Sequence, residues 1–304
     1  MKKEIKDISA SIRAKLLNIA KKENIDFNLL LLRYFQERLL WRLANSNYQK
    51  QFLLKGGLYL MCLKLQKTRP TRDIDLLARQ VKNEMPEIEK IFRDISEIKC
   101  NDGVQFISSS VAAEPIDEDA DYVGIRIKID AVLAQARKKL QIDIGFSDVV
   151  FPKAVQIEFP VLLEGKSPKL TAYSIESVIA EKFEAMIKLS MLNSRMKDFY
   201  DIYSISSGNI FEGDILKEAI EATFTKRQTV LPEEPFVFKE EFRNDADKQI
   251  QWLAFLRKSK LTNADQNFEK TMKNITAFLK LVVISITKKI KMNKTWNPSK
   301  RKWE

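Results

Sequence analysis

The sequence contains no histidine, a notable lack in a chain of 304 residues. Histidine is the commonest general base in enzymes and the commonest protein ligand of metals such as zinc. Its absence excludes Ser-His-Asp triads and every zinc site that depends on imidazole. Any acid–base chemistry in this chain must therefore rely on carboxylates and lysine.

Cysteine is nearly absent as well, since only Cys62 and Cys100 occur. Two cysteines provide neither a disulfide framework nor a four-ligand zinc site, which is typical of a reducing compartment. We interpret Cys62 as a core residue.

The N-terminal residues 1–7 lack the apolar region of a signal peptide. The longest apolar stretch, Ile275–Thr287, is shorter than the about 20 residues that cross a bilayer. We expect a cytoplasmic protein that does not enter a membrane.

Positive charge is what the chain has in excess. Its net charge is +11 and its isoelectric point is about 9.4, while 45% of its residues are hydrophobic. The hydrophobic content argues against disorder, and the length allows one large or two ordinary domains. The charge favours an acidic partner, either a nucleic acid or an anionic membrane surface.

Hydrophobic spacing divides the chain into two parts. Helices are expected over Ser9–Lys22, Phe27–Leu43, Glu84–Ile95, Ala246–Ser259 and Ala264–Ile286. Strands are expected over Asp73–Leu76, Val104–Ser109, Val123–Ile129 and Leu140–Phe146. We therefore expect an α+β chain, with a mixed sheet and flanking helices in residues 1–165 and an α-helical domain in residues 166–304.

Carboxylates gather on the expected strands. Asp73 and Asp75 project from one face of their strand because side chains alternate along it. Paired carboxylates suit Mg²⁺ or Mn²⁺, which proteins hold together with substrate phosphates. Asp143 lies on the polar face of the strand Leu140–Phe146 and is a candidate third carboxylate, with Asp130 as its rival. The alternative is that Asp143 is an ordinary residue on the solvated side of an antiparallel strand.

A phosphate-handling turn is indicated shortly before the acidic strand. In Lys55-Gly56-Gly57 the glycines permit a tight turn, and a helix opening at Gly57 would aim backbone N–H groups at a phosphate. Thr71 and Arg72 then stand next to the acidic pair. The alternatives are a simple turn and a plain surface ion pair.

Two later helices carry charges within their apolar stripes. Lys182 falls in the stripe of the helix after Ser174, while Asp198 and Asp201 lie on the core side of the next helix. Buried acids require cations, and Arg195 is near. One interpretation is an ion-pair lock between two packed helices. The other is a catalytic base, with Lys182 reaching a triphosphate.

Together these motifs resemble the AbiEii/AbiGii toxin family of bacterial nucleotidyltransferases over most of residues 9–205. The motifs in question are Glu37-Arg38, Trp41–Leu43, Leu54–Gly57, Arg69–Asp75, Ile142–Ile144, Glu181-Lys182 and Arg195–Ile202. The resemblance implies a polymerase-β-type nucleotidyltransferase core followed by a helical domain. Leu58 departs from the family, which commonly has Ser or Thr directly after the Gly-Gly pair. The chain after residue 205 carries no motif that we can assign to a family.

The resemblance also implies a function. Such toxins transfer nucleotides from a nucleoside triphosphate to RNA, notably to tRNA 3′ ends, and act with an antitoxin, often a transcriptional regulator, in abortive phage infection. Carried over by position, Asp73 and Asp75 would hold the divalent metal, with Asp143 as the third carboxylate. Lys55, Gly56, Gly57, Thr71, Arg72 and Lys182 would bind the nucleotide. An acid of the Asp198–Asp201 pair would serve the acceptor hydroxyl, and Lys182 would belong to the catalytic set.

Other functions remain open at this point. The same site would also serve nucleotidylation or phosphorylation of a protein, and Leu58 is compatible with a degenerate, non-catalytic module that binds RNA or a partner. The closing segment Lys288–Trp303 interleaves cations with aromatic residues, as nucleic-acid-binding surfaces do. Its alternative is a frayed, solvated terminus.

Overall fold

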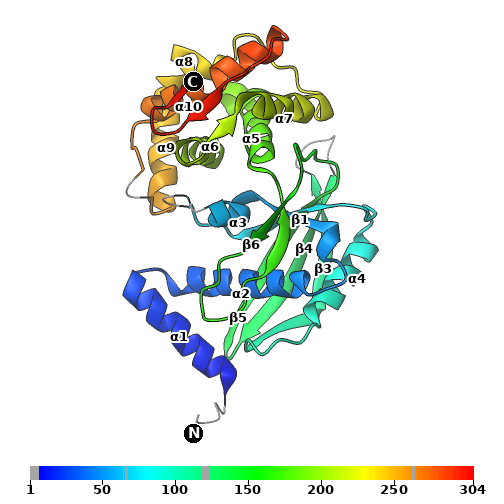
Figure 1. Ribbon diagram of the computed structural model, residues 1–304. Helices are drawn as coiled ribbons and strands as arrows, with labels where there is room; N and C mark the ends of the chain where they lie inside the picture. The colour runs from blue at the N-terminus through cyan, green and yellow to red at the C-terminus, as the bar shows by residue number, and fades with distance from the viewer. Residues whose placement is uncertain (1–6, 64, 66–67, 118–122, 262–263) are drawn as a thin grey trace. The chain divides into compact units, whose positions relative to one another are not determined.

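The computed structural model describes residues 7–63, 65, 68–117, 123–261 and 264–304. Residues 1–6 lie outside these ranges. They make up most of the N-terminal segment in which the sequence showed no signal-peptide pattern. The chain divides into two compact units: residues 1–63, 70–147 and 155–172 form the first, and residues 64–69, 148–154 and 173–304 form the second (Figure 1). Among the described residues, no helix is both long enough and apolar enough to span a bilayer.

A seven-stranded mixed sheet forms the centre of the first unit, with the strand order β3-β4-β5-β2-β1-β7-β6. The strands are β1 (Phe52–Lys55), β2 (Asp73–Ala78), β3 (Val104–Asp117), β4 (Val123–Leu133), β5 (Ala136–Gly145), β6 (Val155–Glu158) and β7 (Lys169–Ala172). Two pairs, β2 with β5 and β1 with β7, are parallel, and the remaining neighbours are antiparallel. The expected mixed sheet is confirmed.

The helices of the first unit are α1 (Ile8–Glu23), α2 (Phe27–Ala44), α3 (Gly56–Leu60) and α4 (Met85–Ser96), with short 3₁₀ turns at Gln49–Gln51 and Met61–Leu63. The long helices match the expected ranges within two residues. Asp7 and Asp26 cap α1 and α2 by accepting hydrogen bonds from backbone N–H groups of the first turn. Eleven of the eighteen residues of α2 are buried, so this helix belongs to the core and is not a solvated flank.

The alternation of side chains along β2 buries the apolar residues and leaves the acidic ones accessible, as expected. Along β2, Ile74 and Leu76 are buried, whereas Asp73 and Asp75 are partly exposed. Strands β1, β6 and β7 were not predicted. Because β7 follows residue 165 and pairs with β1, the sheet extends beyond the expected domain boundary.

The second unit is built mainly from helices, as expected. They are α5 (Ile175–Leu189), α6 (Met196–Gly208), α7 (Gly213–Lys226), α8 (Glu240–Arg243), α9 (Ala246–Lys258) and α10 (Phe268–Thr287), with 3₁₀ turns at Ser190–Leu192 and Phe236–Phe238. Aromatic rings fill its core: Phe199 packs on Phe242 and Phe268 at centroid distances of 5.9 and 5.4 Å.

A small sheet that was not predicted completes this unit. Its strands β8 (Phe211–Glu212), β9 (Thr295–Asn297) and β10 (Lys302–Trp303) bring the end of the chain back to α6, α7 and α10 (Figure 1). Trp296 is 2% exposed and donates to the carbonyl of Ser206, and Trp303 stacks on Phe278. Both sequence-based interpretations of this segment are therefore wrong for its tryptophans, which pack into the unit instead of stacking on bases or fraying.

Candidate active site

Asp75 lies against the backbone of Gly56 in the first unit. Antiparallel pairing of β1 with β2 sets Lys55 opposite Asp75, so the turn after β1 stands beside the acidic strand. The φ angle of Gly56 is +63°, and a Cβ atom there would lie 1.9 Å from Oδ2 of Asp75. Glycine alone combines a relaxed left-handed backbone with the absence of a side chain. The turn therefore makes room for the carboxylate.

The second glycine has a similar role toward Thr71. A Cβ atom on Gly57 would lie 2.7 Å from the Cβ atom of Thr71. The hydroxyl of Thr71 donates to the carbonyl of Asp73 at 3.4 Å. Leu58, the departure from the family pattern, is fully buried and contributes to the core. The expected nucleotide-binding residues of the first unit thus adjoin the acidic strand, although the side chain of Arg72 is exposed to solvent.

Strand register shows which of the two candidates for a third carboxylate lies beside the acidic pair. Parallel pairing of β2 with β5 sets Asp143 opposite Asp75. Asp130 lies on β4, where Arg137 and Lys139 bind it at 2.6 and 3.1 Å. Asp143 is therefore the neighbour of the acidic pair, as expected.

Arg126 on β4 holds Asp143. Its Nε and Nη2 atoms donate to the two carboxylate oxygens at 2.8 and 2.9 Å, a bidentate geometry. The hydrogen bond with Asp143 raises the pKa of the Arg126 guanidinium, and the negative charge of Asp73 adds to the effect. Arg126 thus offsets the charge of Asp143 and part of the charge of Asp73.

The acidic strand offers the ligand chemistry of a hard divalent ion. Asp73 and Asp75 provide oxygen donors, which Mg²⁺ and Mn²⁺ prefer. Within the ranges that the structure covers, no three Asp, Glu, Cys or His residues are grouped to hold a metal by themselves. A Mg²⁺ ion bound through one or two carboxylates and substrate phosphates does not need a third protein ligand. The residues therefore fit a metal that binds together with a nucleotide, and Asp143 as a ligand stays a prediction.

Helix α2 positions the start of the acidic strand. The side-chain amide of Gln36 donates to the carbonyl of Arg72 at 2.9 Å, directly before Asp73. On the same helix Arg42 forms a bidentate ion pair with Asp102 at 2.7 and 3.2 Å. Helix α2 thereby holds the residue before Asp73 through Gln36, and through Arg42 it also holds the loop that precedes β3.

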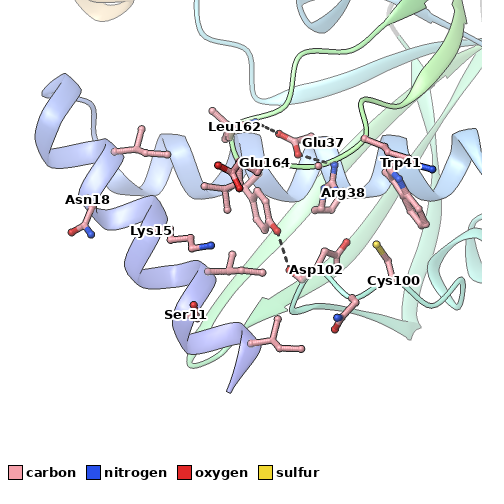
Figure 2. A pocket seen from close by; sticks show the side chains of 18 residues that line it. Ser11, Lys15, Asn18, Glu37, Arg38, Trp41, Cys100, Asp102, Leu162 and Glu164 are labelled. Carbon is pink, nitrogen blue, oxygen red and sulfur yellow. Dashed lines mark hydrogen bonds and ion pairs between the residues drawn. The ribbon is translucent and has the colours of Figure 1, made fainter. Parts of the chain in front are cut away.

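An open cavity of about 1110 Å³ lies between α1, α2 and the loops at 100–102 and 162–166 (Figure 2). Glu37 is 1% exposed and accepts a hydrogen bond from the N–H of Leu162, and Arg38 binds it at 2.8 Å. Burial raises the pKa of the Glu37 carboxyl, against the opposing effect of Arg38. The cavity is therefore lined by a buried ion pair that also ties the 162–166 loop to α2.

The charged residues that the sequence singled out on α5 and α6 form one cluster. Nζ of Lys182 on α5 lies 2.9 Å from Asp198 and 2.7 Å from Asp201, both on α6. Arg69 donates to Asp201 from Nε and Nη2 at 2.9 to 3.2 Å, and Nε of Arg195 donates to Asp198 at 2.9 Å. Both aspartate side chains are 1% exposed. This is the ion-pair lock that the sequence indicated as one of two interpretations.

The lock has a clear electrostatic signature. Burial by itself would raise the pKa of Asp198, but Lys182 and Arg195 outweigh it and lower that pKa to about 2. Burial likewise opposes the charge of Lys182, yet Asp198 and Asp201 raise its pKa. The catalytic roles expected for these three residues stay predictions, since each carboxylate is already engaged by two cations.

A sequence model of the family described as "Nucleotidyl transferase AbiEii toxin, Type IV TA system" matches residues 38–274. The chain belongs to this family. The AbiEii match continues well beyond residue 205, where the sequence motifs ended, and it stops before the β9–β10 hairpin. It also leaves out α1 and the first half of α2.

Two solved structures were compared with this chain, and the similarity of the first is one of fold. The crystal structure of a proposed nucleotidyltransferase from H. pylori is 16% identical, with a TM-score of 0.51, over 88% of this chain and 100% of that one. That of JHP933 from Helicobacter pylori is also 16% identical, with a TM-score of 0.49, over 87% and 95% of the two chains. A comparison with curated protein sequences gives no match.

Two residues beside the acidic strand were missed from the sequence. Arg126 lies in the strand that was predicted over Val123–Ile129, and the alternation of that strand already placed Arg126 on its polar face. Its pairing with Asp143 depends on the register of β4 and β5, which the sequence did not reveal. Gln36 lies in the middle of an apolar helix, and that position was the only available signal.

Proposed function

We propose that this AbiEii-family protein transfers nucleotides from a nucleoside triphosphate to an RNA acceptor, with the tRNA 3′ end as the first candidate, and thereby blocks translation. The observation that carries the proposal is the placement of Asp73 and Asp75 on one face of β2, with the Gly56 turn packed on Asp75. The type IV toxin–antitoxin family implies an antitoxin. We propose that it is a transcriptional regulator and that the pair acts in abortive phage infection.

The chemistry follows from the charges around the acidic strand. In this reaction the acceptor hydroxyl of the RNA attacks the α-phosphorus in line and pyrophosphate leaves. Asp73 and Asp75 would hold the divalent metal, which would offset negative charge on the triphosphate. Lys55 lies opposite Asp75 on β1 and Arg72 directly precedes Asp73, and their positive charges would attract and orient the phosphates. Thr71 would lie beside the same phosphates. Positioning and electrostatics can supply most of the acceleration, so a histidine is not required.

The test is incubation of the purified protein with Mg²⁺, total tRNA and each α-labelled nucleoside triphosphate in turn. The Asp73→Ala variant serves as the inactive comparison, and its folded state is checked by circular dichroism. We expect a labelled RNA band with the unmodified protein and none with the variant. Transfer that persists in Asp73→Ala would overturn the assignment of the acidic strand.

Two other outcomes identify the alternatives. Label confined to protein bands in a cell lysate would make a protein the acceptor. The third alternative is a module without catalysis, with which the engagement of Asp143 by Arg126 is compatible. Tight RNA binding without any binding of Mg²⁺ and nucleotide in calorimetry would establish that alternative.

A further inference from the structure

Positive charge is concentrated at the end of the chain. Residues 288–304 contain seven Lys or Arg residues and one Glu, an excess of six in a chain whose net charge is +11. The AbiEii match ends at residue 274, so this concentration lies outside the part that the family model describes. It is therefore a feature of this chain that the family assignment does not explain.

The charges fall into two groups. On the β9–β10 hairpin, Lys300 and Lys302 bind Glu304 at 2.9 and 3.3 Å, and Arg301 donates to Asn274. The segment 288–294 between α10 and β9, which we term the lysine loop, is different. Its four lysines, Lys288, Lys289, Lys291 and Lys294, are exposed, and none has an ion-pair partner among the described residues.

The lysine loop is held firmly against the second unit. Its Met292 is 3% exposed, and the backbone N–H of Met292 donates to Asp214 at 2.8 Å. The ammonium of Lys217 donates to the carbonyl of Ile290 at 3.0 Å. At Gly213 a Cβ atom would lie 2.5 Å from the carbonyl oxygen of Met292, so the loop backbone packs directly on α7. The loop therefore presents its four lysines from a fixed backbone.

The neighbouring aromatic residues do not take part in such a surface. Trp296 is buried, and the indole N–H of Trp303 donates to the carbonyl of Phe278 at 2.9 Å. Trp296 is thus out of reach of bases and Trp303 already stacks on Phe278, so the exposed chemistry of the loop itself is that of ammonium groups. Ammonium groups contact phosphates without reading the base sequence.

We propose that the lysine loop is an RNA-binding surface that contacts the phosphate backbone and holds the acceptor RNA on the second unit. This inference rests on the proposed function for the identity of the polyanion. Four lysines without competing carboxylate partners have their full charge available to phosphates, and their fixed backbone lowers the entropic cost of ordering them. The expected contact is insensitive to sequence and sensitive to salt.

The experiment measures fluorescence anisotropy of a labelled single-stranded RNA and of tRNA with the full-length protein, without nucleotide, over a range of KCl concentrations. The variant replaces Lys288, Lys289, Lys291 and Lys294 by Gln. The matched control replaces four exposed lysines of the first unit, Lys21, Lys22, Lys90 and Lys99. Both variants lose four charges, and thermal unfolding verifies that both remain folded.

We expect the loop variant to bind RNA at least about tenfold more weakly at about 100 mM salt, with the salt slope reduced by up to about 3. The control should keep most of the affinity. An unchanged affinity and slope in the loop variant, or an equal loss in the control, would overturn the inference. So would protein that binds vesicles containing anionic lipid but not RNA.

Because binding is measured without catalysis, the two proposals can fail separately. Loss of RNA affinity in the loop variant of a protein that transfers nothing would support the surface and refute the transferase. Undiminished affinity in a protein that labels tRNA would refute the surface alone.

Discussion

The carboxylate of Asp75 fills the space that a side chain at Gly56 would need: a Cβ atom on the glycine would lie 1.9 Å from the carboxylate oxygen Oδ2. The acidic strand and the turn are thus interdependent, because the carboxylate has its position only while residue 56 has no Cβ atom.

The first prediction concerns this pair. Gly56→Ala should displace Asp75 and strain a left-handed backbone, and misplacement of a catalytic group by about 1 Å can cost about 100-fold in rate. The measurement is the rate of nucleotide transfer to tRNA. The control is Gly208→Ala, where the closest atom to the added Cβ is a Leu65 methyl carbon at 3.4 Å and no left-handed angle is required. Transfer at the normal rate in Gly56→Ala would contradict the role assigned to the turn.

The second prediction concerns Lys182. Lys182→Met should destabilise the protein by about 3 kcal/mol, because removal of one partner of a buried ion pair leaves charge uncompensated. Lys197→Met, on the exposed face of α6, should change stability by less than about 0.5 kcal/mol. Thermal unfolding of both variants checks this. A stable Lys182→Met protein with a raised KM for nucleotide would instead establish contact with the triphosphate.

The third prediction is a dependence of stability on pH. The pKa of Asp198 is lowered from 3.8 to about 2 in the folded protein, so its contribution is complete above about pH 4. It is lost as the pH falls from about 4 toward 2, and its size is on the order of 2 kcal/mol. Urea unfolding at a series of acidic pH values should show this loss. Asp198→Asn should show a shallower dependence, and an identical slope in the two proteins would exclude Asp198 as its source.

The fourth prediction concerns the cation beside the acidic cluster. Arg126→Gln should increase the affinity of the nucleotide-free protein for Mn²⁺ by about tenfold, the equivalent of about 1.4 kcal/mol of removed repulsion. Calorimetric titration measures it. Arg137→Gln is the matched control, since it removes an arginine that pairs with Asp130 elsewhere in the same sheet. Weaker Mn²⁺ binding in Arg126→Gln would show that the arginine supports the metal site.

Much of the first unit could be predicted because its signals are local. The alternation that puts Asp73 and Asp75 on one face requires only neighbouring residues, and helical spacing identified α1, α2 and α4 within two residues. Strands β6 and β7 have only four residues each, which is too short for periodicity to separate them from loops.

The rest depends on contacts between distant segments. The pairing of Arg126 with Asp143 follows from the register of β4 and β5, which no local pattern specifies. Trp296 was interpreted as a surface residue because lysines surround it in sequence, yet β9 pairs with β8, far earlier in the chain, and this pairing buries it. Leu58 looked like a lost phosphate contact, and the structure makes it a core residue.

The second unit is assembled from three separate stretches of the chain, and this has a consequence for its independence. The first stretch ends with Arg69, which binds Asp201, and the second begins with Asp148, which binds Arg227 at 2.9 Å. A fragment beginning at residue 173 would contain Asp201 and Arg227 without these partners. The unit is therefore a compact domain that is not encoded by one contiguous segment, so no single segment of the gene can transfer it to another protein. During synthesis Arg69 leaves the ribosome more than a hundred residues before the helices with which it packs, so the unit cannot complete its fold until they follow.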